Sequence, residues 1–178
     1  MSQRRSQSPY DVLPPVPTFI VTSNDMLDGA PLPLAHVFNG MGLEGQNRSP
    51  HLVWSAFPVE TKSFAVTCFD PDAPTGSGFW HWLVVNIPSA VNELLTDAGS
   101  GDDSLPGDAF HTRNDYGLAA YGGAAPPPGH GDHRYIFAVH ALSCEELGVD
   151  SSSSGASVGF NLTFNTIARA VMTPIFGR

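Results

Sequence analysis

Three short clusters hold the side chains most capable of chemistry, and the first spans residues 70–74. Its sequence is Asp-Pro-Asp-Ala-Pro, and it directly follows an apolar run. Two carboxylates and two prolines make a stiff loop of fixed direction, from which an acid could orient a neighbouring histidine. An ordinary Asp-Pro turn with both carboxylates in solvent has the same spacing, so both interpretations stay open.

The second cluster, Phe-Trp-His-Trp, begins the next apolar run. Side chains alternate between the two faces of a strand, which predicts that His81 shares a face with Phe79 and Leu83. The same alternation places Trp80 and Trp82 on the other face. A histidine among apolar side chains is either a binding residue or a hydrogen-bonded core residue, and this cluster alone does not separate the two.

The third cluster, Gly-His-Gly-Asp-His-Arg-Tyr, follows three consecutive prolines. His133 and Tyr135 are two residues apart and therefore point to one face of a strand. Arg134 points to the other face, where it could pair with a loop carboxylate. His130 and His133 have a spacing seen in metal sites, but a glycine lies between them and no third ligand is fixed. We expect ordinary loop histidines and no metal.

Several other kinds of site are excluded by missing motifs. The chain has no G-x-S-x-G, no phosphate-binding G-x-x-x-x-G-K-[ST] and no cysteine–histidine nucleophile pattern, so we expect no cofactor. Cys68 and Cys144 are the only cysteines, and we expect free thiols. Eight Lys and Arg against 17 Asp and Glu give a net charge of −9. That balance argues against nucleic-acid binding and against adsorption to anionic membranes.

The elements that position these clusters are expected to be short strands. The 18 glycines and 16 prolines in 178 residues argue against a helical bundle and predict many turns. Residues 1–17 are predicted to be a flexible N-terminal arm, and residues 18–178 a single domain. Strand-like runs cover residues 18–23, 34–38, 51–57, 63–69, 79–87 and 133–142. Residues 88–132 form a long, acidic, irregular stretch, which is usually functional in a compact domain.

One helix is predicted near the C-terminus. Ser157 can cap it, and Pro174 would end it. Its apolar residues recur at spacings of three and four, and they are Phe160, Phe164, Ile167, Ala168 and Val171. The first residues lack the apolar segment of a secretory signal, and no apolar run reaches the ~20 residues that span a bilayer. We therefore expect a cytoplasmic protein with no integral membrane association.

Taken together, the three clusters resemble the phosphatidylethanolamine-binding protein family. The resemblance rests on residues 70–74, 80–88 and 126–135, with Asn-Asp-Tyr-Gly at 114–117 and weaker agreement over most of the chain. It is strongest to the bacterial and archaeal Raf-kinase-inhibitor-like branch. The runs Phe-Trp-His-Trp and Ala-Ala-Pro-Pro-Pro-Gly-His-Gly are most similar to actinobacterial members.

The resemblance implies an all-β-dominated, Greek-key fold of two antiparallel sheets with few peripheral helices and a C-terminal helix. It also implies a pocket for phosphate, a phospholipid headgroup phosphate or acetate at one end of the large sheet. Carried over onto this sequence, the pocket residues are Asp70, His81, His133 and Tyr135, with walls shaped by Pro74, Trp80, Gly123, Ala125 and Pro126. The resemblance further implies a homodimer, and it adds to the expectation that the Ala73–Pro74 bond in this two-proline loop is cis.

The main functional hypothesis is a non-enzymatic binding protein for a small anionic or phosphorylated ligand, which could regulate a kinase or protease partner. Asp70 does not suit direct contact with an anion, so we expect it to orient His81 or His133 and to stabilise the imidazolium. The alternative is an enzyme that uses Asp70, His81 and His133 for acid–base chemistry on a small substrate. A third hypothesis is an interaction protein that inhibits a kinase or protease through acidic residues 93–132.

Overall fold

The centre of the structure is a five-stranded antiparallel sheet in a computed structural model that describes residues 7–178. Its strand order is β6-β4-β3-β8-β9. The strands are β3 (Ser63–Asp70), β4 (Phe79–Pro88), β6 (Phe110–His111), β8 (Ile136–Leu142) and β9 (Thr166–Met172). Every residue of β3 and β8 is buried, because these central strands are covered on both faces, as their continuous apolar runs predict.

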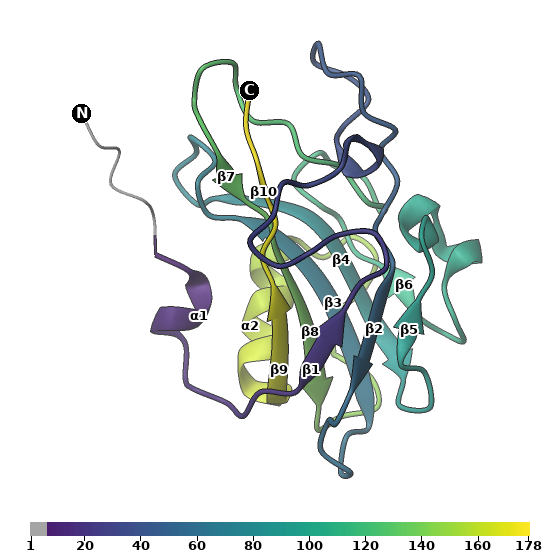
Figure 1. The fold of residues 1–178 in the computed structure, drawn as a ribbon. Coiled ribbons are helices and arrows are strands. Elements are labelled where there is room, and N and C mark those ends of the chain that lie inside the picture. The colour runs from purple at the N-terminus through teal and green to yellow at the C-terminus, as the bar shows by residue number, and fades with distance from the viewer. Residues whose placement is uncertain (1–6) are drawn as a thin grey trace.

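A smaller three-stranded sheet covers one face of the large sheet (Figure 1). It consists of β1 (Ile20–Thr22), β2 (Leu52–Ser55) and β5 (Glu93–Leu94). The main core lies between the sheets, where the Trp54 ring meets the Phe64 ring edge-on at 5.3 Å. A two-stranded ribbon of β7 (His133–Arg134) and β10 (Ile175–Phe176) adjoins one end. The predicted β-rich fold with a helix near the C-terminus is confirmed.

The helix α2 (Gly155–Asn165) covers the other face of the large sheet (Figure 1). It begins after Ser154, whose hydroxyl accepts a hydrogen bond from the amide of Ser157 at 3.2 Å, so the predicted cap residue is three positions too late. The predicted core face of this helix is also wrong. Val158 and Leu162 pack on the sheet, whereas Phe160 and Phe164 are 67% and 72% exposed.

The helix ends at Asn165, and the predicted continuation to Pro174 is instead the edge strand β9. Residues 166–172 have apolar side chains at helical spacing, but they pair with β8 along their whole length. The hydrogen bonds of this pairing stabilise the strand over the helix. Ala168 and Ala170 point into the main core. A second segment, residues 34–38, was predicted as a strand but forms the 3-10 turn η1 (Leu34–His36). Only Val37 makes an isolated bridge there, to Ala124.

The long stretch of residues 88–132 is mostly irregular, as predicted, with the short turns η2 (Ala98–Ser100) and η3 (Asp102–Ser104) beside β5 and β6. Part of the predicted arm, residues 1–6, lies outside the described residues. Within residues 7–17, α1 (Pro9–Val12) places the Tyr10 ring 5.8 Å from the His140 ring. Cys68 and Cys144 are free thiols. Among residues 7–178, no helix has the length and apolar character that a membrane crossing requires.

Candidate functional site

The large sheet brings three of the predicted site residues to one cavity of about 170 Å³. Asp70 ends β3, His81 lies near the start of β4, and His133 begins β7. Pro74 and Ala125 also line this cavity. His81 and His133 are far apart in the sequence, and the prediction that they meet in one cleft is confirmed.

A hydrogen bond to Asp70 fixes the His133 ring. Oδ2 of Asp70 accepts a hydrogen bond from Nδ1 of His133 at 2.7 Å, and both side chains are almost fully buried. Oδ1 of Asp70 accepts from the backbone amide of Asp72 at 2.8 Å. We expected Asp70 to orient one of the two histidines, and the structure shows that this one is His133.

A third histidine joins this pair. Nδ1 of His130 lies 2.7 Å from Nε2 of His133, so the hydrogen-bonded chain runs from Asp70 through His133 to His130. A proton lies between the two rings, and the ring that donates it depends on which imidazole is charged. The sequence suggested an ordinary loop histidine at His130, although its spacing of three residues from His133 was visible as a signal.

His81 is held in one tautomer by backbone carbonyls. Its Nδ1 lies 2.8 Å from the oxygen of Gly122 and 3.1 Å from that of Gly123. Carbonyl oxygens only accept, so Nδ1 carries the proton. Among residues 7–178, Nε2 has no hydrogen-bond partner. Burial lowers the pKa of His81, and this effect exceeds the opposing effects of the Gly122 carbonyl and of Asp70. The neutral ring therefore leaves Nε2 as an acceptor.

Two tyrosines pack against His81. The Tyr135 ring meets it edge-on at 5.1 Å, and the buried Tyr135 hydroxyl has no well-formed hydrogen bond among the described residues. Burial raises the pKa of Tyr135, so the hydroxyl keeps its proton and is available as a donor. Tyr116, which lines the cavity, was missed. Its hydroxyl donates to the Gly123 carbonyl at 2.9 Å, and its signal was the Asn-Asp-Tyr-Gly run.

An ion pair fixes the loop that carries Pro74. The Arg134 guanidinium donates to both carboxylate oxygens of Asp72, at 2.8 and 2.7 Å, and this confirms the expected pairing of Arg134 with a loop acid. The amide of Thr75 donates to the carbonyl of Ala73 at 2.7 Å, which makes a three-residue turn around Pro74.

The predicted cis Ala73–Pro74 bond is wrong, because residues 7–178 contain no cis peptide bond. The three-residue turn reverses the chain with all bonds trans. Gly78, at a φ of 71°, completes the return to β4.

Trp80 lies on the other face of the sheet, away from His81 and His133. The register between β3 and β4 shifts at Cys68/Phe69, so Phe69 pairs with Trp80 and the alternation is interrupted at His81. The Trp80 ring packs 4.5 Å from the Phe69 ring and lines a cavity beneath α2. The predicted face of Trp80, shared with Trp82, is therefore wrong.

The remaining predicted wall residues act through their backbones. Gly123 presents its carbonyl to His81, and a Cβ at this position would lie 2.5 Å from the backbone of Val37 and of Phe38. Only glycine permits that close approach. Pro126 accepts a hydrogen bond from Nε of Arg178 at 2.7 Å, whereas the neighbouring Pro127 lines the cavity. Within residues 7–178, no three His, Cys, Asp or Glu side chains are placed to hold a metal ion.

The sequence model described as Phosphatidylethanolamine-binding protein matches residues 22–177. The chain belongs to the phosphatidylethanolamine-binding protein family. Within it, the chain is 55% identical over 154 residues to the Escherichia coli K12 protein YbhB, which covers 86% of this chain and 97% of YbhB. These values agree with the resemblance to the bacterial branch of phosphatidylethanolamine-binding proteins.

Solved structures of the phosphatidylethanolamine-binding protein family share this fold. The crystal structure of E. coli YbcL, 55% identical, matches with a TM-score of 0.88 and covers 90% of this chain and 98% of that chain. A putative homologue from Chlamydia trachomatis, 24% identical, matches with a TM-score of 0.74 over 90% of this chain and 98% of its own. At that identity, the second match shows the fold alone.

Proposed function

We propose that this chain is a non-enzymatic binding protein that takes phosphate, free or as a phospholipid headgroup, in the cavity of His81 and His133. The observation that carries the proposal is the convergence of both imidazoles on one cavity lined also by Asp70. A volume of about 170 Å³ is below the ~300 Å³ of sites for drug-sized ligands. It suits a headgroup phosphate rather than a whole lipid.

The hydrogen-bonding groups of the cavity suit an anion that shares a proton with His81. The neutral His81 ring offers a lone pair at Nε2, so an anion needs either its own proton or one taken up by the ring. Monohydrogen phosphate and dihydrogen phosphate supply both donor and acceptor oxygens. The Tyr135 ring packs against His81 with the ring centres 5.1 Å apart, and its hydroxyl keeps its proton as a further donor. Asp70 is occupied by His133, which reduces its repulsion of the ligand.

Calorimetry tests this proposal with phosphate, phosphoethanolamine and acetate as separate ligands. We expect His81→Ala to weaken phosphate binding by ~1.5–3 kcal/mol, the usual contribution of a charge-assisted hydrogen bond. His51→Ala is the matched control, because His51 is also buried but bonds to Glu93, at the smaller sheet. Equal phosphate binding by His81→Ala and the unmodified chain would contradict the site.

The same ligands separate binding from catalysis. A binding protein leaves phosphoethanolamine intact during prolonged incubation, as phosphorus NMR would show. An acid–base enzyme built on Asp70, His81 and His133 would convert it or a related ester at a rate that falls in His133→Ala. Tighter binding of phosphoethanolamine than of phosphate would favour a headgroup over the free ion.

A further inference from the structure

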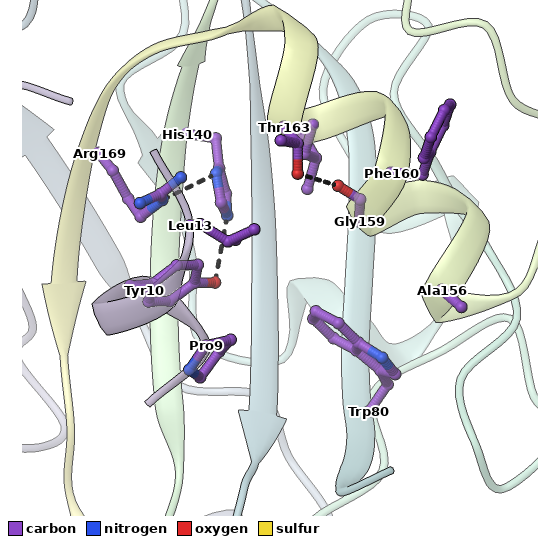
Figure 2. Close-up of a pocket in the computed structure, with 11 residues that line it drawn as sticks. Pro9, Tyr10, Leu13, Trp80, His140, Ala156, Gly159, Phe160, Thr163 and Arg169 are labelled. Carbon is purple, nitrogen blue, oxygen red and sulfur yellow. Dashed lines mark hydrogen bonds between the residues drawn. The ribbon is translucent and has the colours of Figure 1, made fainter. Parts of the chain in front are cut away.

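A second cavity, of about 300 Å³, lies between α1 and α2, on the face of the five-stranded sheet that carries Trp80 (Figure 2). It is enclosed by the α1 segment on one side and by α2 on the other. Its walls are mainly carbon, from Pro9, Leu13, Trp80, Phe160 and Leu162. Gly159 contributes no side chain, and a Cβ there would make ordinary van der Waals contact with the Trp80 ring at 3.7 Å. A longer side chain at this position would therefore enter the cavity beside Trp80.

Of the residues that the structure describes, 7–178, Arg169 is the only one lining this cavity whose side chain carries a full charge. It is 9% exposed. Its Nε donates to Nδ1 of His140 at 3.4 Å, and its guanidinium carbon lies 4.2 Å from the centre of the Tyr10 ring. Among residues 7–178, no carboxylate lies within salt-bridge distance of Arg169.

The neighbours of Arg169 do not neutralise its charge. Burial raises the pKa of Tyr10, which stays a neutral phenol. Burial and the nearby guanidinium lower the pKa of His140 to about 3, so this ring is neutral and accepts from Arg169. A buried cation without a counter-ion is costly. An anion that entered the cavity would recover part of that cost.

We propose that this cavity binds an aliphatic monocarboxylate, with the carboxylate at Arg169 and the hydrocarbon chain along Trp80 and Leu162. The positive charge selects the headgroup, and the bidentate fork of a guanidinium matches a carboxylate. The apolar walls select the chain, because each methylene that leaves water contributes about 0.8 kcal/mol to binding. Phe160, exposed at 67%, provides an apolar rim.

The α1 segment forms part of this binding site. The Tyr10 hydroxyl lies 3.3 Å from Oγ1 of Thr67 and 3.5 Å from Nε2 of His140, which holds the segment against the sheet. Pro9 and Leu13 then close one wall. The site therefore depends on residues far from the histidine cavity, and it is distinct from the proposed phosphate site.

Titration of the full chain with octanoate, octanol and octylammonium tests the proposal by calorimetry. Octanoate should bind, and octylammonium should bind at least about tenfold more weakly because its charge repels Arg169. Octanol reports the contribution of the apolar walls alone. Equal affinity for octanoate and octanol would overturn the role of Arg169. No octanoate binding at millimolar concentration would overturn the site itself.

Four variants, one of them a control for charge, locate the bound octanoate. Arg169→Gln should weaken octanoate about tenfold or more and leave octanol unchanged, which also shows that the cavity is still folded. Arg113→Gln is the control, because it removes the same charge at an exposed position. Gly159→Leu should block both ligands by filling the space beside Trp80. His81→Ala should bind octanoate normally, whereas its loss there would place octanoate in the phosphate cavity and contradict the proposal.

Discussion

Nδ1 of His133 lies 2.7 Å from Oδ2 of Asp70, and the two side chains come from β7 and from the end of β3. A carboxylate in this position fixes the orientation of its partner ring. The second nitrogen of His133 lies 2.7 Å from Nδ1 of His130. His133 is thus positioned from both sides.

The first prediction concerns Asp70→Asn. An amide replaces the charge-assisted hydrogen bond to Nδ1 of His133 with a neutral one, so the ring is held less firmly and phosphate affinity at pH 7 should fall. Phosphate titrations by calorimetry measure this affinity. Asp103→Asn, at an exposed position, controls for the change in net charge. Unchanged affinity in Asp70→Asn would show that this hydrogen bond does not contribute to binding.

The second prediction concerns the proton on His81. Burial lowers the pKa of His81 below its usual 6.5, so the ring is neutral in the free protein near pH 7. A phosphate oxygen at Nε2 favours the charged ring, and binding should therefore take up as much as ~1 proton. Calorimetry in buffers with different ionisation enthalpies measures this uptake. It should largely disappear in His81→Ala, and an unchanged uptake in that variant would assign the proton to another group.

The third prediction concerns acid stability. His140 has a pKa of about 3 in the folded protein, whereas in the unfolded chain it is close to 6.5. As the pH falls, the unfolded chain therefore takes up this proton before the folded protein does. The neutral ring contributes its full stabilisation of the fold above pH 6.5, and this contribution is lost below it. Between pH 7 and 5, His140 should cost about 2 kcal/mol of unfolding free energy.

Urea unfolding at pH 7 and pH 5 measures this loss in the unmodified chain and in His140→Asn. The variant lacks the titrating ring, so its difference between the two pH values should be smaller by about 2 kcal/mol. Arg169 donates to this ring and favours its neutral form. Equal pH differences in both proteins would show that another group dominates the acid sensitivity.

The fourth prediction concerns self-association. The rings of Phe160 and Phe164 lie 5.0 Å apart on the exposed face of α2, where they form a small aromatic patch. We expect a homodimer at tens of micromolar, measured by sedimentation, and a shift toward monomer in Phe164→Ser. Val59→Ser is the control, because Val59 is 97% exposed but lies outside this patch. A monomeric unmodified chain would contradict this prediction.

The sequence by itself determined the β-rich class and most of the residues at the histidine cavity. The runs at residues 63–69 and 79–87 are apolar on both faces, and this local property is enough to predict strands at the centre of a sheet. The clusters containing Asp70, His81 and His133 follow or begin such strands. Their side chains are therefore placed at strand ends before any contact is known.

Only the tertiary structure decided which strands pair, which face Trp80 takes and which side chains lie beside Arg169. Residues 166–172 carry helical spacing, but the unpaired edge of β8 makes them a strand. Strict alternation would place Trp80 on the same face as Trp82. The register shift between β3 and β4 at Cys68/Phe69 places Trp80 on the α2 face instead. The pairing of β8 with β9 places Arg169 beside His140, and no carboxylate among residues 7–178 lies within salt-bridge distance of it. Strand pairing, bulges and ion pairs depend on residues distant in sequence, so a local pattern does not specify them.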